Sequence, residues 1–188
     1  MNFKAMTLSL AAALAVGAAQ AQSLSVSPSP KDVLIGEAFS LEVQASGFAN
    51  PIIGGGFELN FDPTILQLNT VTIPANWEFA RSGGTIDNVA GTVKDAFFAT
   101  FSAPKAGAFL TGTLNFTAVG LGSSAVTLSA NAGQPFIEDG TLDAVSPIFK
   151  AGLVNVAAVP EPSTMALVLA GTGLMAVMGR RRKNVEKI

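Results

Sequence analysis

The 188-residue sequence contains no cysteine, no histidine and no tyrosine, and charged residues make up only 13% of it. Without cysteine there can be no disulfide framework, no thiolate metal site and no cysteine nucleophile. Without histidine, the chain lacks the side chain that most often acts as a general base or binds a metal ion. These absences exclude several large classes of enzyme, and they leave the stability of the fold to its core.

Basic residues are scarce between the two apolar ends of the chain. Residues 22–159 contain 11 acidic and five basic residues, a net charge of −6. Binding to nucleic acid requires clustered Lys and Arg side chains that meet phosphate groups, and the five basic residues are scattered. We therefore expect no nucleic-acid partner.

Carboxylates are the remaining route to catalysis or metal binding. A glycosidase needs two of them across a cleft, but most acidic residues here lie beside Gly, Pro or Asn, which favours turns and solvated surface. Glu138, Asp139 and Asp143 in "EDGTLD" are a candidate calcium site, because Ca²⁺ prefers oxygen ligands on a loop, although the repeating ligand pattern of a calcium loop is missing. We expect no cofactor and no enzymatic activity.

The N-terminus has the three parts of a secretory signal peptide. Lys4 supplies the positive charge, residues 5–19 form an apolar stretch, and Ala19-Gln20-Ala21 fits the small-x-small cleavage pattern. The alternative is a buried N-terminal helix. We predict that residues 1–21 are a signal peptide, that the mature chain starts at Gln22, and that the protein is exported.

The middle of the chain alternates apolar and polar residues with a period of two, which predicts half-buried strands. In "AFSLEVQASGF" and "GGGFELNFDP" every second side chain is apolar, and Asp62-Pro63 is expected to end the second strand. Five further runs continue the pattern. The predicted inward residues are Phe39, Leu41, Val43, Ala45, Phe57, Leu59, Phe61, Leu66, Leu68, Leu110, Leu114, Phe116, Val126, Leu128, Val154 and Val156, with Val71, Ile73 and residues 93–101 as less regular additions.

Gly-, Asn- and Asp-containing segments separate these runs, at Ser46-Gly47, Gly54-Gly56, Ser82-Gly84, Asp87-Asn88 with Gly91, Gly120-Gly122 and Asp139-Gly140. Among them, Gly54-Gly56 is expected to be a bulge or the start of a strand. Roughly eight short strands without a helical period before Pro160 predict an all-β fold, an antiparallel β-sandwich or jelly roll. Most of the 13 Phe residues are expected in its core. Trp77, in "PANWEFA", is either a packing residue or, with Phe79, an exposed platform that stacks on a ligand.

The order of these segments resembles the cohesin family. The resemblance lies in "VLIGEAFSLEVQASGF", "GGGFELNFDPTILQLNTVTI", "DNVAGTVKDAFFATF" and "GTLNFTAVGLGSSAVTLSA", and it ends with "GLVNVA". It implies a nine-stranded jelly-roll sandwich, placed here at residues 22–158. Cohesins of cellulosomes hold dockerin modules, but the quoted segments are core and turn positions, and fold alone does not assign function.

The C-terminus combines a proline box, an apolar run and a basic cluster. Met165 to Gly179 form an apolar run of 15 residues, which reaches roughly 22 Å as a helix against a hydrocarbon core of about 30 Å. The basic cluster Arg180, Arg181, Arg182 and Lys183 predicts a cytoplasmic end, with the sandwich outside. We predict a single membrane helix of marginal length, since a helix buried in the sandwich would need a polar face.

Residues 159–184 resemble the PEP-CTERM sorting signal in all three parts. The recognition box is Pro160, Glu161, Pro162 and Ser163, followed by the transmembrane run and the Arg-rich stop. The resemblance implies recognition and removal of the tail by a membrane protease of the exosortase type, in Gram-negative bacteria that make exopolysaccharide. The chain would be held at the inner membrane during sorting and would then reach the cell surface or the extracellular space.

Together these observations predict an exported, non-enzymatic protein of the cell surface or extracellular matrix. Two alternatives remain open for the sandwich. It could be a carbohydrate-binding module for matrix polysaccharide, stacking sugars on Trp77 and Phe79, or it could bind another surface protein in the manner of a cohesin with a dockerin. A hydrolase would require paired carboxylates in a cleft.

Overall fold

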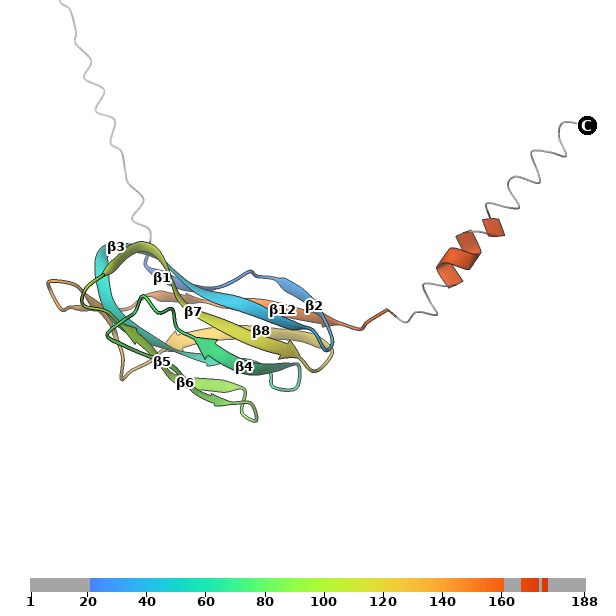
Figure 1. The fold of residues 1–188 in the computed structure, drawn as a ribbon, viewed down its shortest axis with the longest axis horizontal. Coiled ribbons are helices and arrows are strands. Elements are labelled where there is room, and N and C mark those ends of the chain that lie inside the picture. Colours follow the sequence, from blue (N-terminus) through green and yellow to red (C-terminus); the bar gives the residue numbers. More distant parts are fainter. Residues whose placement is uncertain (1–20, 161–166, 173, 176–188) are drawn as a thin grey trace, which may run out of the picture.

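The computed structural model describes residues 21–160, 167–172 and 174–175. Strands dominate the described residues (Figure 1), and residues 167–172 and 174–175 are helical. The strands are β1 (Ser23–Ser27), β2 (Lys31–Leu34), β3 (Ala38–Asn60), β4 (Leu66–Thr72), β5 (Ala80–Asp87), β6 (Thr92–Ala99), β7 (Lys105–Ala118), β8 (Gly122–Ala130), β9 (Phe136–Glu138), β10 (Ala144–Val145), β11 (Ile148–Lys150) and β12 (Gly152–Ala157).

The strands form a β-sandwich, as predicted, because one continuous hydrogen-bonded sheet folds over into two layers. In one layer the order is β11-β1-β3-β7-β4. In the other it is β5-β6-β3-β8-β12-β2. The N-terminal part of β3 belongs to the first layer and its C-terminal part to the second, with the short β9-β10 pair attached near the crossing.

The length of β3 was not expected from the sequence. Two separate strands were predicted, divided at Ser46-Gly47, with Gly54-Gly56 as a bulge or the start of the second strand, but β3 runs through both segments for 23 residues. Register shifts against β7 follow Ala45 and Phe48, so the strand bends without ending. Bulges and glycines let a strand turn the corner between two layers. The glycines therefore mark the crossing between layers and not a loop.

The alternation of apolar residues places the core where it was predicted. Of the regularly spaced inward residues, all are buried except Leu110, which is half-buried. Their polar neighbours in sequence, such as Ser40 and Glu42, face solvent. Side chains on alternate sides of a strand explain this division, because only one side of each layer faces the other layer.

Two pairings depart from the antiparallel arrangement that was expected. β1 lies parallel to β11, and β2 lies parallel to β12. Both join the start of the sandwich to its end. The predicted runs also did not include β1 or β5, and β5 passes through Ser82-Gly84, which was predicted as a turn. They missed the short elements β2, β9, β10 and β11 as well, which contain two to four residues each. Runs this short contain too few residues to display a period of two.

Several predictions concern residues outside the described ones. The signal peptide and Ala19 lie there, whereas Ala21 is exposed ahead of β1. At the other end, seven of the 15 residues of the predicted membrane run and the whole basic cluster lie outside the described residues. Of the side chains described there, Leu167, Val168, Leu169, Leu174 and Met175 are all exposed. Within the described part of the chain, no helix is both long and apolar enough to cross a membrane.

Candidate binding site and sorting segment

Two exposed phenylalanines pack against each other at one end of the sandwich. Phe79, just before β5, is 62% exposed, and Phe101, just after β6, is 63% exposed. Their ring centroids are 4.3 Å apart and the rings meet edge to face. Large aromatic side chains usually bury most of their area. A pair that instead faces solvent is a candidate contact surface.

Glu78 fixes the turn that carries Phe101. One carboxylate oxygen, Oε1, accepts hydrogen bonds from the backbone N–H groups of Phe101 (3.2 Å) and Ser102 (3.0 Å) and from the Ser102 hydroxyl (2.8 Å). The other, Oε2, accepts one from the Thr100 hydroxyl at 2.6 Å. Hydrogen bonds to a charged acceptor are among the strong ones. The side chain of Glu78 therefore helps to hold the turn after β6.

These hydrogen bonds shift the titration of Glu78. The Thr100 hydroxyl is the largest cause and the Ser102 backbone N–H the next, and together they hold the pKa of Glu78 well below its usual range. Hydrogen bonds to the ionised form of a carboxyl favour that form. Glu78 is thus charged throughout the neutral and mildly acidic pH range, and its hydrogen bonds to the turn persist there.

Backbone contacts tie the same turn to β3 and to the segment before β5. Thr100 is fully buried, and its N–H donates to the carbonyl of Ile53 at 2.7 Å. The N–H of Phe79 donates to the carbonyl of Ala99 at 3.1 Å. Both phenylalanines are therefore attached to rigid strands. Their exposed rings are positioned before any ligand arrives, which lowers the entropic cost of binding.

The pair forms one wall of an apolar hollow of about 170 Å³. Its floor is the glycine segment of β3 together with the end of β6, and its far wall is the segment that leads into β9. The lining residues are Ile53, Gly54, Gly55, Phe79, Phe98, Ala99, Phe101, Gln134, Pro135 and Ile137. Only Gln134 brings a polar side chain to it. The hollow therefore suits an apolar group better than a polar one.

A second, smaller hollow of about 140 Å³ lies on the other side of Gln134 and Pro135. Phe136, Val145 and Phe149 supply its apolar walls. Asn131 also lines it, with Oδ1 accepting from the Gly133 N–H at 2.9 Å, while its buried Nδ2 has no hydrogen-bond partner in the described structure. The segment between β8 and β9 thus separates two adjacent hollows at this end of the molecule.

Trp77 does not belong to the exposed surface, so its proposed role in ligand stacking is wrong. Its side chain is completely buried, and its ring lies 4.4 Å from Phe98 and 5.7 Å from Phe109 by centroid distance. The indole Nε1–H donates to the Leu110 carbonyl at 3.2 Å, and Lys105 Nζ lies 5.0 Å from the ring centroid. The other role considered for Trp77 from the sequence, that of a packing residue, is the correct one.

Phe79, the second residue proposed to stack on a ligand, is exposed as that role requires. The sequence did not point to its partner Phe101, or to Glu78, which accepts hydrogen bonds from the turn that carries Phe101. Phe101 sits at the end of the predicted strand 93–101, where an alternating pattern does not distinguish a core residue from a surface one. Glu78 acts on residues 22–24 positions away in sequence, and no local pattern reveals such a contact.

The proposed calcium ligands do not converge. Glu138 is buried and its Oε2 accepts from Asn50 Nδ2 at 2.9 Å, while Asp139 and Asp143 are exposed. The N–H of Glu138 donates to the carbonyl of Asp143 and brings the two backbones together, but the Glu138 side chain points into the fold while the other two face solvent. Among the described residues, no three His, Cys, Asp or Glu side chains come together as a metal site requires.

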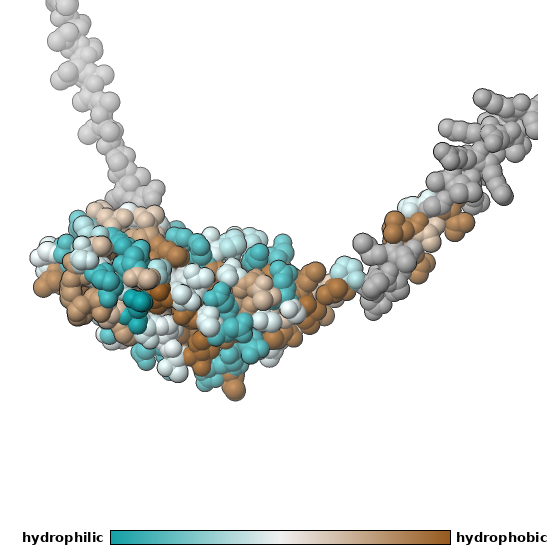
Figure 2. Space-filling view, viewed as in Figure 1, coloured by the Kyte–Doolittle hydropathy of each residue, from teal (hydrophilic) through white to brown (hydrophobic). Residues whose placement is uncertain are grey.

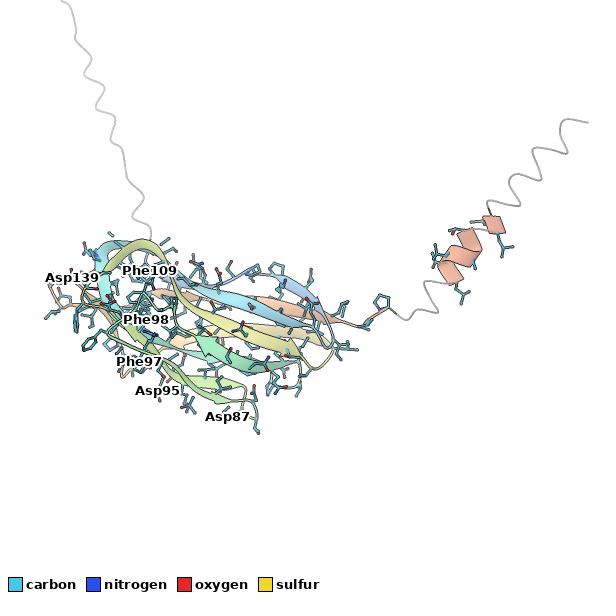
Figure 3. All side chains as sticks on the ribbon, in the orientation of Figure 1. Asp87, Asp95, Phe97, Phe98, Phe109 and Asp139 are labelled. Carbon is cyan, nitrogen blue, oxygen red and sulfur yellow. The ribbon has the colours of Figure 1, made fainter. Side chains whose placement is uncertain are left out.

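Other carboxylates are spread along the molecule. Figure 3 shows Asp139 at one end and Asp87 toward the other, with Asp95 between them. The pKa of Asp87 is lowered by the backbone N–H groups of Ala90 and Val89, which it caps in the turn after β5. The pKa of Asp62 is lowered by hydrogen bonds from the Thr64 hydroxyl and from the Thr64 backbone N–H. These two carboxylates thus stabilise turns, as their sequence neighbours indicated.

The sorting segment begins immediately after the last strand. β12 ends at Ala157, and Ala158, Val159 and Pro160 are exposed beyond it. Of the predicted recognition box, only Pro160 is described; Glu161, Pro162 and Ser163 lie outside the described residues, as do Arg180, Arg181, Arg182 and Lys183. The chain thus leaves the sandwich at the end opposite the Phe79–Phe101 pair (Figure 1).

Comparison with known protein families finds one match, the PEP-CTERM protein-sorting motif, over residues 158–183. The motif indicates an exported protein that is processed at a membrane. A comparison with curated protein sequences finds no significant match.

Among solved structures the similar ones are cohesins. The seventh ScaB type I cohesin of Pseudobacteroides cellulosolvens aligns with a TM-score of 0.59 at 13% identity, covering 75% of this chain and 95% of that one. The OlpA cohesin in a cohesin–dockerin complex of Clostridium thermocellum aligns with 0.60 at 8%, covering 73% and 99%. A non-cellulosomal cohesin of the archaeon Archaeoglobus fulgidus aligns with 0.58 at 12%, covering 78% and 96%.

Identities this low establish the fold alone, and the sorting motif covers only the C-terminal part of the chain. Within these bounds both resemblances seen in the sequence are confirmed. The chain carries a PEP-CTERM protein-sorting motif at residues 158–183 and, ahead of it, a β-sandwich with the cohesin fold.

Proposed function

We propose that this protein is an exported, non-enzymatic component of the cell surface or extracellular matrix, and that its sandwich binds another protein through the Phe79–Phe101 hollow. An exosortase-type membrane protease would recognise the sorting motif, in a cell that makes exopolysaccharide. The observation that carries the proposal is the combination of a sorting motif directly after the last strand with a preformed apolar contact site at the opposite end.

The chemistry of the hollow favours a protein partner over a polysaccharide. Sugars present many hydroxyl groups, each of which must keep a hydrogen bond when it leaves water. The hollow offers one polar side chain, Gln134, and the edge-to-face packing of Phe79 on Phe101 leaves no broad flat platform. A volume of about 170 Å³ accommodates an aliphatic or aromatic side chain of a partner. Buried aromatic anchors of this kind dominate the binding energy of many protein interfaces.

The fold supports the same preference. The OlpA cohesin of similar structure was solved in complex with a dockerin, so a sandwich of this kind can hold a protein partner. The surface used by that cohesin is not carried over, because at 8% identity no interface residue can be matched. The proposed contact rests on the exposed phenylalanines of this chain.

Binding assays with paired variants test the proposed site. The chain from Gln22 would be immobilised and exposed separately to the secreted proteins and to the purified exopolysaccharide of the producing cell. We expect a bound protein that is lost with Phe79→Ser or Phe101→Ser and retained with Val89→Ser. Val89 is 92% exposed in the turn between β5 and β6, away from the hollow, and is therefore a matched control. Retention of polysaccharide that depends on the two phenylalanines would instead support the carbohydrate-binding alternative.

Intact mass spectrometry of the extracellular protein tests sorting. We expect a chain that begins at Gln22 and ends within residues 158–183, since a processing enzyme would remove the apolar run and basic cluster. Deletion of residues 180–183 should leave the unprocessed chain with the cells. A secreted chain that extends through Ile188 would contradict the proposal.

A further inference from the structure

The end of the sandwich from which the tail leaves carries a ring of exposed aliphatic side chains. Figure 2 shows hydrophobic residues gathered there, beside the point where the chain continues toward its C-terminus. We call this ring the apolar collar. Its members and their exposed fractions are Leu34 (40%), Ile35 (38%), Val119 (42%), Leu121 (58%) and Val159 (55%).

The collar is a single surface although its residues come from three segments. Ala157, the last residue of β12, pairs with Leu34 of β2, and its carbonyl accepts from the N–H of Ile35 at 2.9 Å. On the other side, Val156 pairs with Gly122 of β8, which places Leu121 beside the end of β12. The loop from Ala118 to Leu121 and the end of β2 thus surround the point where the tail begins.

The first layer of the sandwich closes the ring, through the end of β7 and the segment before β4. The N–H of Gly36 donates to the Ala118 carbonyl at 2.8 Å, and the N–H of Val119 donates to the Ile65 carbonyl at 2.8 Å. Ladder and loop hydrogen bonds hold the segments that carry Leu34, Ile35, Val119 and Leu121 in place, so these side chains stay exposed. Soluble domains seldom leave such a cluster exposed without a partner.

Charge at this end is arranged so that it does not interrupt the collar. Neither Lys nor Arg occurs in residues 34–37, 62–65, 118–122 or 157–160. Of the acidic residues in these segments, Asp62 accepts at Oδ1 from the Thr64 N–H at 2.9 Å, and Glu37, beside Leu34 and Ile35, accepts at Oε2 from the Leu34 N–H at 2.9 Å. The Glu37 carboxylate thus folds back onto its own turn, and the tip of that turn is aliphatic.

The short segment between β12 and the apolar run indicates what the collar contacts. Seven residues, 158–164, separate Ala157 from the apolar run that begins at Met165, and they span at most about 28 Å when extended. If the run is embedded in the inner membrane, as the proposed function holds, the end of the sandwich that bears the collar faces the bilayer at short range. Tethering raises the effective concentration of one surface at another, so a contact too weak to hold a free domain becomes populated.

We propose that the apolar collar rests on the lipid surface while the tail is anchored, and that it thereby holds Val159 and Pro160 at the level of the lipid headgroups. This inference rests on the proposed membrane anchoring of the tail. The contact is hydrophobic, since the collar has no basic side chains to attract anionic lipid. Once the tail is removed, the tether is lost and the collar alone no longer keeps the sandwich on the membrane.

Single-cysteine labelling tests the collar, because the natural chain contains no cysteine. Leu121→Cys and, as a control, Phe101→Cys at the opposite end would each carry an environment-sensitive fluorophore. The chain from Gln22 to Ile188 would be reconstituted in phosphatidylcholine vesicles that contain a lipid-borne quencher. We expect the emission at position 121 to shift to the blue and to be quenched, whereas position 101 keeps its aqueous emission. Raising the salt concentration should not reverse the shift.

Two readouts separate this inference from the proposed function. Flotation with vesicles reports whether the tail inserts, and the label at position 121 reports whether the collar touches lipid. Flotation with an aqueous signal at position 121 overturns the collar contact and leaves the sorting proposal standing. Failure to float overturns both. Protection of the label together with a doubled particle mass in detergent, without lipid, would show that a second copy covers the collar, which also overturns lipid contact.

Discussion

Trp77 and Phe79 are two positions apart in the sequence, yet they serve opposite roles in the structure. Trp77 lies between Phe98 and Phe109 with no exposed surface, while Phe79 is 62% exposed and contacts Phe101. No strand links them, because residues 78 and 79 lie just before β5. The period-two rule therefore does not apply, and only the packed structure assigns one residue to stability and the other to binding.

The two residues should separate stability from recognition. We expect Trp77→Ala to lower the free energy of unfolding by about 3–5 kcal/mol, the usual cost of removing a large buried aromatic side chain. Phe79→Ala should cost about 1 kcal/mol, mostly for the lost contact with Phe101. Denaturant unfolding followed by circular dichroism would measure both. Equal losses for the two variants would contradict the division of roles.

Glu78 should make stability depend on pH in the acidic range. Its pKa is lowered in the folded state, so its contribution is complete above the ordinary glutamate pKa of about 4.3 and is lost as the pH falls toward the lower folded value. In the Glu78→Gln variant this contribution is absent at every pH. We therefore expect the melting temperatures of the two proteins to differ at pH 7 and to converge below pH 4.

The comparison isolates Glu78 because the other acidic groups with lowered pKa values, Asp62 and Asp87, are common to both proteins. A difference in melting temperature that is the same at pH 7 and pH 3 would show that the carboxylate charge is not what holds the turn. Binding to a partner through Phe101 should weaken in the same variant, since the turn would lose its anchor.

At the scale of the elements, β3 is the strand on which the two layers depend. It pairs with β1 and β7 before the crossing and with β6 and β8 after it. The crossing is close-packed: a Cβ atom on Gly55 would lie 2.8 Å from the ring of Phe136, and one on Gly56 would lie 2.7 Å from the Ala96 carbonyl oxygen. Glycine is needed here because no other residue leaves room for the neighbouring strand.

Substitution at the crossing should therefore be costly. We expect Gly55→Ala to destabilise the fold by about 1–3 kcal/mol through overpacking, and Phe136→Leu should recover part of this loss in the double variant. Gly133→Ala is the control, since its Cβ atom would lie no closer than 3.5 Å to any neighbour. Thermal or denaturant unfolding of the natural chain, Gly55→Ala, Phe136→Leu and the double variant would measure these effects. A double variant no more stable than Gly55→Ala would place the strain elsewhere.

The same strand shows how far the sequence could predict the elements. Alternation identified Phe39, Leu41 and Val43 and, separately, Phe57 and Leu59 as inward residues, because burial of one face imposes a period of two on the sequence. The glycines between them were read partly as turns, since local signals do not distinguish a bend within a strand from its end. The hollow beside them was not predicted, because its lining residues come from four separate segments of the chain that meet only in the folded structure.

On the scale of the whole molecule, β2 from the start of the sandwich pairs with the last strand, β12. β12 lies between β8 and β2, and its side chains Val154 and Val156 are buried. We expect a chain that ends at Ala158 to melt at the same temperature as the full chain in detergent, since it keeps all twelve strands. A chain that ends at Ala151 lacks β12 and should not fold. Equal melting of the two truncated chains would contradict the central role of β12.

The position of β12 between two neighbouring strands has a mechanical consequence. A pull on the tail reaches the sandwich along the axis of a strand that is bonded on both sides. The force loads the β12–β8 and β12–β2 ladders in shear, so many hydrogen bonds must break at once. An edge strand pulled outward would instead lose its hydrogen bonds one at a time. If the tail stays attached and transmits flow or drag, it therefore pulls on a strand whose two ladders resist the load together.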